Sequence, residues 1–221
     1  GFAAAAEATA LGADVILLEK LSEFGGSSAK SGGCLAFAGT DIQEAAGIID
    51  SAETLFQDLR EVGRYQNDEA LVRAYADHQL DTFEWLRSQG VLFSPVLEAA
   101  AGQSAPRAHN VDPADMVRVL AARAMATGLC DYQAGRAARH LIRDAQSGRV
   151  TGVATDQGDV RARRGVILAS GGFCKNPDLI HRFAPHYDEA IFIGGEGSTG
   201  DGLRMAWKLG ADLRDMAYIK G

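Results

Sequence analysis

The 221-residue sequence lacks the features that mark several classes of protein. No apolar run reaches about eighteen residues, so no membrane-spanning helix is predicted. No long run of like charges indicates an interaction tail, and the formal net charge of -7 argues against general binding of nucleic acid. With a hydrophobic content of 47% and a charged content of 23%, the composition is that of an ordinary soluble globular protein.

Cysteine is also scarce. Cys34, Cys130 and Cys174 are far apart and show no C-x-x-C spacing. Neither a disulfide framework nor a zinc site is therefore predicted, and each cysteine is expected to be a small buried apolar side chain.

The first nineteen residues have the pattern of half a nucleotide-binding unit. Residues 1–11 are mostly small and predict a helix that Gly12 ends, and the apolar run 15–18 predicts a parallel strand buried on both faces. In a dinucleotide-binding unit, the last glycine of G-x-G-x-x-G opens the helix and an acid about twenty residues later binds the adenosine ribose. Gly1 fits that glycine and Glu19 fits that acid. On this interpretation the first strand and two glycines precede Gly1, and the alternative is an ordinary crossover that binds nothing.

A glycine-rich and serine-rich loop, residues 25–33, follows the predicted strand. Such a loop lets the backbone approach a ligand closely and supplies hydroxyl and N–H donors. The alternative is a flexible surface linker.

Residues 41–127 are predicted to be helical. Three helices are expected, at 50–63 with Asp50 and Glu53 as a capping pair, from 67–69 to Gly90, and from Asp112-Pro113 to Gly128. The loop 93–110 between the last two contains Arg107 and His109. Ligand contact is one hypothesis for this pair, and a solvated arginine with a hydrogen-bonded structural histidine is the other.

After residue 128 the pattern becomes strand-like. Segments 129–133, 137–143, 150–155 and 160–163 predict a small antiparallel meander, and 165–173 predicts a second fully buried strand ending in a glycine pair. Asn176-Pro177 starts a short helix, and the glycine-rich stretch 194–202 precedes a helix that Gly210 ends. Asp201 is placed at the N-terminus of this helix, where it could bind a ligand or act only as a cap.

These motifs together resemble the FAD-binding flavoproteins of the fumarate reductase and succinate dehydrogenase type, which include soluble fumarate reductases, enoate reductases and 3-ketosteroid 1-dehydrogenases. The matching segments are GADVILLEK at 12–20, GGSSAKSGG at 25–33, GVILASGGF at 165–173 and STGDGLRMAWKLGA at 198–211. The resemblance implies an α/β fold, with one Rossmann-like FAD-binding domain of the glutathione-reductase type over residues 1–221. This domain would carry a helical insertion and an antiparallel β-meander and would be truncated at both ends. At its start the first strand and two glycines would be missing, and at its end DMAYIKG at 215–221 resembles the point where such proteins enter a mobile capping domain.

The resemblance also implies the cofactor-binding residues. They are Gly1 at the pyrophosphate, Glu19 at the adenosine ribose, Gly25, Gly26, Ser27, Ser28, Gly32 and Gly33 along the pyrophosphate and isoalloxazine, Ala138 at the adenine through its backbone, and Lys20, Ser170, Gly171 and Asp201 as further contacts. Members that hold FAD covalently use a histidine beside the glycine and serine loop. The histidine nearest that loop in sequence is His78, so non-covalent FAD is expected.

The implied activity is that of a flavoprotein oxidoreductase acting on C–C and C=C bonds beside an electron-withdrawing group. A dicarboxylate such as fumarate or a related enoate is the first substrate hypothesis, and a 3-ketosteroid is the second. The catalytic residues are expected to lie outside this chain, and the electron donor or acceptor is not predicted. A nicotinamide-dependent dehydrogenase and an FAD-holding scaffold without turnover are the rival interpretations. A cytoplasmic location is expected, although a signal peptide before Gly1 would not be visible.

Overall fold

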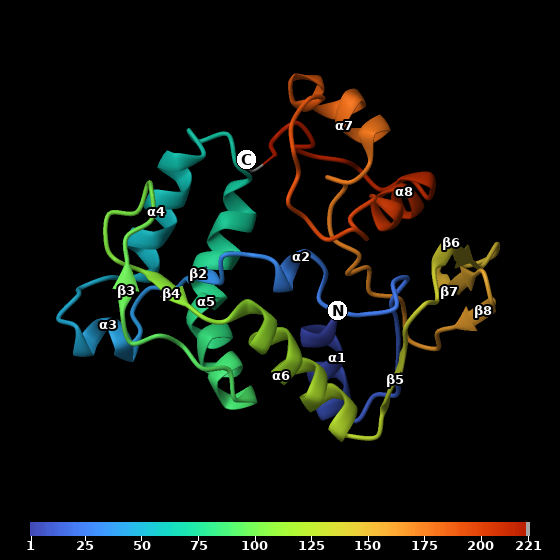
Figure 1. The fold of residues 1–221 in the computed structure, drawn as a ribbon, viewed down its shortest axis with the longest axis horizontal. Coiled ribbons are helices and arrows are strands. Elements are labelled where there is room, and N and C mark those ends of the chain that lie inside the picture. Colours follow the sequence, from blue (N-terminus) through green and yellow to red (C-terminus); the bar gives the residue numbers. More distant parts are fainter. Residues whose placement is uncertain (220–221) are drawn as a thin grey trace. The chain divides into compact units, whose positions relative to one another are not determined.

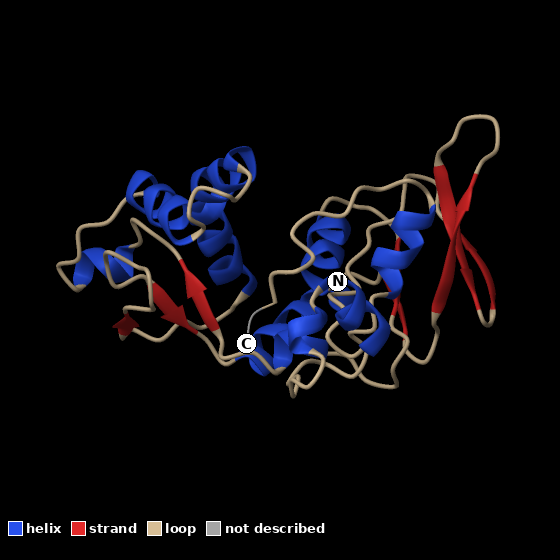
Figure 2. Cartoon of the chain, turned by 90° about the horizontal axis from the view of Figure 1, so that it is seen from above, coloured by secondary structure: helices blue, strands red, loops and turns tan. Residues whose placement is uncertain are grey.

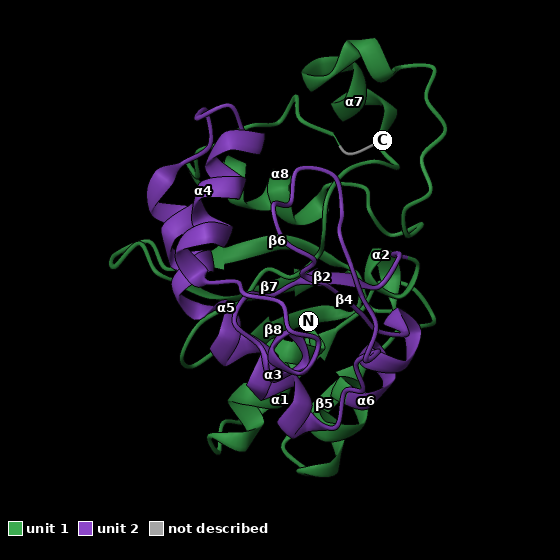
Figure 3. Ribbon diagram, turned by 90° about the vertical axis from the view of Figure 1, so that its left-hand side faces the viewer, with its two compact units in different colours: residues 1–30, 120–221 green, residues 31–119 purple. Residues whose placement is uncertain are grey.

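The computed structural model describes residues 1–219, so the end of the 215–221 motif, Lys220 and Gly221, lies outside the described residues. Two compact units divide the chain. Unit 1 comprises residues 1–30 and 120–221, and unit 2 comprises residues 31–119 (Figure 3). The prediction of a single domain over 1–221 stays a prediction.

Unit 1 is a mixed α/β structure (Figures 1 and 2). Its elements are α1 (Phe2–Ala10), β1 (Val15–Leu18), α2 (Gly26–Ala29), β5 (Cys130–Gln133), β6 (Ala138–Arg143), β7 (Val150–Thr155), β8 (Gly158–Arg161), α7 (Pro177–Phe183), the 3-10 helix η1 (Pro185–Tyr187) and α8 (Asp201–Lys208). The predicted start of the chain is confirmed, since α1 is followed by Gly12 at a left-handed φ of 79° and then by β1.

Unit 1 contains a parallel strand pair. β1 pairs with β5 from Val15↔Cys130 to Leu18↔Gln133. The prediction that 129–133 belongs to the meander is therefore wrong, because a short strand-like segment does not itself specify its partner. The prediction that β1 is buried on both faces is also wrong, since Ile16 is exposed.

The apolar segment 165–173 differs most from its prediction. It forms no strand, and Ile167 is 72% exposed. No strand among the described residues pairs with it. Because a strand is defined by hydrogen bonds to a neighbour, apolar composition alone does not form one.

The antiparallel meander β6-β7-β8 is confirmed (Figure 2). Gly152 lies in the middle of β7 and pairs with Arg161 of β8. A Cβ atom at Gly152 would overlap the carbonyl oxygen of Val160 and come within 3.1 Å of the Cα of Arg161. Only glycine fits this close approach of two backbones.

We expect Gly152→Ala to lower the free energy of unfolding by about 1–3 kcal/mol, because the methyl group must displace the backbone of β8. Urea unfolding followed by circular dichroism measures the change. Gly165→Ala is the matched control, since a Cβ atom there meets nothing within 4 Å. Equal stability of the two variants would contradict the prediction.

Unit 2 combines helices with a small sheet. Its elements are β2 (Cys34–Ala36), α3 (Asp41–Ala45), α4 (Ala52–Val62), α5 (Glu69–Gln89), β3 (Leu97–Glu98), β4 (Ala108–Asn110) and the first part of α6 (Pro113–Ala126). The three predicted helices are confirmed, whereas the antiparallel sheet of order β2-β4-β3 was not predicted, because its strands have only two or three residues. Its core includes the rings of Phe37, Phe83 and Phe93, which pack against one another and against His109.

Three smaller expectations from the sequence are wrong. Ser51, not Asp50, caps α4, since the Ser51 hydroxyl accepts a hydrogen bond from the Thr54 N–H. Cys34 is exposed, and Cys130 and Cys174 of unit 1 are only half-buried, so none of the cysteines is buried as expected. Arg107 is fully buried, which excludes the solvated arginine considered for the loop 93–110.

Candidate functional site

Glu19 lies at the carboxyl end of β1. Its N–H donates to the carbonyl of Gln133 at 2.9 Å, and its own carbonyl accepts from the N–H of Arg136 at 2.9 Å. Its carboxylate Oε1 accepts a hydrogen bond from the Leu21 N–H at 2.9 Å. Oε2 has no hydrogen-bond partner among residues 1–219, so one oxygen of a fixed carboxylate is left to accept a hydrogen bond from a ligand.

The start of α1 lies beside the Leu17 side chain of β1. A Cβ atom at Gly1 would be 3.5 Å from Leu17 Cδ1, and Gly1 provides no side-chain cap for the helix. The first N–H groups of a helix have no acceptor within the helix. This terminus therefore has donors that can bind an anionic group.

Ser27 connects two glycine-rich segments that are distant in sequence. Its hydroxyl lies 2.9 Å from that of Ser198 and accepts a hydrogen bond of 2.9 Å from the N–H of Gly195. The backbones are also in direct contact, because a Cβ atom at Gly195 would be 2.7 Å from Gly26 C and Ser27 N. The loop after β1 and the loop before α8 are thus held side by side.

Lys20 makes a second connection between these segments. Its ammonium group donates to Thr199 Oγ1 and, at 2.7 Å, to Asp201 Oδ2. Burial by itself would raise the pKa of Asp201, but hydrogen bonds from Lys20 and Thr199 and the charge of Lys20 outweigh it and lower the pKa. Asp201 is the first residue of α8 and Gly200 is its N-cap, so the alternative that Asp201 acts only as a cap is wrong.

A third segment lies close to the other two. The Ser170 hydroxyl fills the position that a Cβ atom at Gly202 would need, and a Cβ atom at Gly171 would be 3.8 Å from Ser198 Oγ. The carbonyl of Gly172 accepts a hydrogen bond from the N–H of Gly200 at 3.0 Å. The three glycine-rich segments are therefore in contact with one another within unit 1.

Comparison with known proteins identifies this arrangement. The family model described as "FAD binding domain" matches residues 1–219. The chain belongs to this family. FAD is therefore the cofactor of this chain.

Its relatives are flavoenzymes of related kinds. It is 34% identical over 229 residues to a fumarate reductase (cytochrome) of Shewanella frigidimarina, covering 100% of this chain and 40% of the relative. It is 34% identical over 220 residues to a vinyl phenol reductase of Lactiplantibacillus plantarum, covering 96% of this chain and 44% of the relative. The chain thus spans less than half the length of these curated relatives.

Solved structures agree with the sequence relatives. A 3-ketosteroid-Δ4-(5α)-dehydrogenase from Rhodococcus jostii matches with a TM-score of 0.89 and 29% identity, over 98% of this chain and 53% of the other. The open conformation of a flavocytochrome c3 fumarate reductase matches with a TM-score of 0.89 and 29% identity, over 96% of this chain and 38% of the other. The predicted fold class is confirmed.

The residues of the converging loops fit a dinucleotide cofactor. A Cβ atom at Gly26 or Gly172 would meet nothing within 4 Å, so the backbone at both positions is open to a ligand. The donor set is also suitable, since N–H groups and serine hydroxyls suit phosphate and the free oxygen of Glu19 suits a ribose hydroxyl.

Three further predicted cofactor residues belong to other elements. Gly32 and Gly33 belong to unit 2, where the carbonyl of Gly33 accepts from the N–H of Val111 at 3.0 Å. Ala138 begins β6 and pairs with Thr155. Gly195 and Ser198 were missed by the prediction although they lie in the glycine-rich stretch 194–202, because nothing local signals a partner 168 residues away.

Arg107 and His109 are parts of a buried polar network in unit 2. The Arg107 guanidinium binds Asp50 through two hydrogen bonds of 2.8 Å and also binds Asp58. His109 Nδ1 donates to the carbonyl of Arg107 at 2.8 Å, and its Nε2 lies 2.8 Å from Thr40 Oγ1. Nδ1 is assigned the proton because a carbonyl can only accept. The structural interpretation of His109 is thus confirmed.

We expect His109 to make the protein less stable in weak acid. Burial lowers the pKa of His109, and the Arg107 carbonyl and the charges of Asp41 and Asp50 only partly offset this. The unfolded state therefore binds a proton more readily, so stability is complete above about pH 6.5 and falls toward the folded pKa by at most about 1.4 kcal/mol per pH unit.

Urea unfolding at several pH values between 7.5 and 5.5 measures this slope. His109→Asn should reduce the slope, whereas His78→Gln should keep it because the side chain of His78 is 76% exposed. The same slope in His109→Asn as in the wild type would contradict the assignment.

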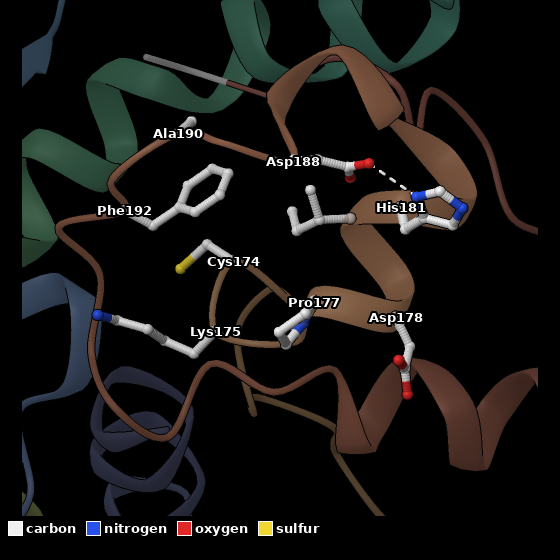
Figure 4. A pocket seen from close by; sticks show the side chains of 9 residues that line it. Cys174, Lys175, Pro177, Asp178, His181, Asp188, Ala190 and Phe192 are labelled. Atoms are coloured by element: carbon white, nitrogen blue, oxygen red, sulfur yellow. Dashed lines mark hydrogen bonds and ion pairs between the residues drawn. The ribbon is translucent and has the colours of Figure 1, made fainter.

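A separate hollow lies in unit 1. It has a volume of about 660 Å³ and is lined by α7 and by the loops on either side of it, including Cys174 and Phe192. Figure 4 shows Asp188 paired with His181 at its rim. None of the predicted cofactor residues lines this hollow, and its mixed charges select no ligand class.

No group of three metal-ligating side chains occurs among residues 1–219. Over the same residues, no helix combines the length and apolar composition needed to cross a bilayer.

Proposed function

We propose that this chain is the flavin-binding part of an oxidoreductase that reduces or forms a C=C bond beside an electron-withdrawing group, as fumarate reductases do. The observation that carries the proposal is the convergence of the three glycine-rich segments at the end of β1, in a chain of the FAD-binding domain family. Relatives include reductases of fumarate, vinyl phenol, acrylate and urocanate. A dicarboxylate or related enoate is the proposed substrate.

Residues 1–221 are proposed to act as one FAD-binding domain. Gly1 with the N–H groups at the start of α1, together with the loops at Ser27 and Ser170, would hold the pyrophosphate and flavin, and Glu19 would bind the adenosine ribose. The full proposed set is Gly1, Glu19, Lys20, Gly25, Gly26, Ser27, Ser28, Gly32, Gly33, Ala138, Ser170, Gly171 and Asp201. Within it Lys20 and Asp201 would act as a pair, because the bond between them fixes the start of α8 beside β1.

When bound, FAD supplies hydride transfer to or from a substrate carbon through its N5 atom. The residues of this chain bind and orient that group. The Glu19 carboxylate accepts from a ribose hydroxyl, and the backbone N–H groups of the glycine-rich loops neutralise phosphate charge. No residue of the described chain is assigned as a proton donor to the substrate.

Binding and turnover test the proposal. The purified protein is expected to be yellow and to show the visible absorbance of a bound flavin. The amount of flavin should be on the order of one FAD per chain. Acid precipitation should release the flavin, as the proposed non-covalent attachment requires. Oxidation of a reduced viologen should depend on added fumarate. Bound flavin without turnover would support an FAD-binding scaffold, and a protein with no affinity for FAD would overturn the proposal.

A 3-ketosteroid is the second candidate substrate. It is favoured by the match to the R. jostii dehydrogenase, whose TM-score of 0.89 equals that of the fumarate reductase. Reduction of an artificial electron acceptor by the protein with 4-androstene-3,17-dione would select this candidate. A cytoplasmic location is also proposed, on the ground that Cys34, Cys130 and Cys174 are free thiols. Cell fractionation checks it.

A further inference from the structure

The hydroxyl of Tyr132 is a buried polar group that the chain does not satisfy. No donor or acceptor among residues 1–219 lies within hydrogen-bonding distance of its Oη atom. Buried hydroxyl groups in native proteins are nearly always paired, because burying one without a partner costs free energy. A partner outside the described residues is therefore expected.

The position of Tyr132 indicates where that partner lies. Tyr132 is on β5, directly opposite Leu17 of β1. Paired residues of a parallel sheet lie on the same face, and Glu19, two residues beyond Leu17, lies on this face as well. Gly1 is on this face too, since its Cβ position is 3.5 Å from Leu17 Cδ1. The tyrosine thus shares a face with the start of α1 and with the free carboxylate oxygen.

The ring of Tyr132 is held in place by two phenylalanines. Its centroid is 5.4 Å from that of Phe2 at the start of α1 and 5.8 Å from that of Phe24 in the loop between β1 and α2. Phe2 and Phe24 also pack edge to face at 4.9 Å. Because the three rings fix one another, the hydroxyl has a defined position and little rotational freedom to find another partner.

The hydroxyl is also electrostatically close to Glu19. Burial raises the pKa of Tyr132, and the negative charge of Glu19 raises it further. The hydroxyl therefore stays protonated at neutral pH and can both donate and accept a hydrogen bond. A ribose, with neighbouring hydroxyls that also donate and accept, matches a carboxylate and a phenol placed together.

We propose that Tyr132 is a further FAD-binding residue, whose hydroxyl hydrogen-bonds to the adenosine ribose that Glu19 binds. This assignment rests on the proposed function of the site. In this role, Phe2 and Phe24 hold the ring of Tyr132 so that its hydroxyl faces the cofactor.

The test is Tyr132→Phe, which removes only the hydroxyl. Titration of the deflavinated protein with FAD should give a Kd about threefold to tenfold higher than that of the wild type, the loss of one neutral hydrogen bond. The Kd for ADP, which contains the same ribose, should rise by a similar factor. The melting temperature of the flavin-free variant should be equal to or higher than that of the wild type, because the variant no longer buries an unpaired hydroxyl. Tyr65→Phe, at a side chain that is 64% exposed, is the matched control and should change none of these values.

Each other outcome is decisive. An unchanged Kd for FAD in Tyr132→Phe, with normal binding by the wild type, would overturn the role of Tyr132 and leave the proposed function standing. A higher Kd for FAD with an unchanged Kd for ADP would overturn the ribose assignment. A lower melting temperature of the flavin-free variant would show that the hydroxyl has a structural partner and would also overturn it. If the wild type binds no FAD, the proposed function fails and this inference fails with it.

Discussion

Replacing Arg107 by methionine is expected to lower the free energy of unfolding by about 3–5 kcal/mol. Arg107 and Asp50 have fully buried side chains that form two hydrogen bonds of 2.8 Å, and Asp58 binds the same guanidinium. Methionine has a similar length but no charge. Asp50 would then be a buried carboxylate without its cation, and the two remaining neutral donors, Gln43 Nε2 and the Ser51 N–H, each at 2.9 Å, cannot compensate for the lost charge.

Two comparisons make the result specific. Adding Asp50→Asn to Arg107→Met should recover part of the loss, because it removes the unpaired charge. Arg118→Met is the control for loss of an ion pair, since Arg118 and Asp115 are 65% and 37% exposed and such pairs contribute about 0–1 kcal/mol. Urea unfolding gives all three values. If Arg107→Met and Arg118→Met were equally stable, the buried pair would have no structural role.

Gly195→Ala is expected to damage both stability and FAD binding. The new Cβ atom would lie 2.7 Å from Gly26 C and Ser27 N, which are backbone atoms and cannot rotate away. The loops must separate, which breaks the hydrogen bond from the Gly195 N–H to Ser27 Oγ and the contact between the Ser27 and Ser198 hydroxyls. The free energy of unfolding should fall by about 1–3 kcal/mol, and the Kd for FAD should rise by about tenfold or more.

Thermal melts with and without FAD separate the two effects. In Gly195→Ala both the melting temperature and its increase on adding FAD should be smaller than in the wild type. Gly165→Ala is again the control, because its Cβ atom has free space. If FAD raised the melting temperature of Gly195→Ala as much as that of the wild type, contact between the two loops would not matter for the cofactor.

Local chemistry explains why most helices were predictable from the sequence. Asp68, Asp112 and Asn176 each accept a backbone hydrogen bond at a helix start, and Gly90 ends α5 with a left-handed φ of 99°. Such signals act within a few residues, so they can be recognised without a partner. The same reasoning failed at Asp50. Its residue type suits a helix cap, but its carboxylate instead binds the Arg107 guanidinium, which is distant in sequence.

By itself, the sequence determined the α/β class, the meander, the family resemblance and the order of the glycine-rich loops, because each depends on short-range pattern. Only the tertiary structure decided that β5 pairs with β1, that residues 165–173 form no strand, and that Lys20 and Ser27 bind the loop at 195–201. It also distinguished the buried Arg107 from an exposed one and revealed the unpaired hydroxyl of Tyr132. These features depend on which distant segments meet and on which polar atoms lose water when they do, and neither is encoded in any local stretch of residues.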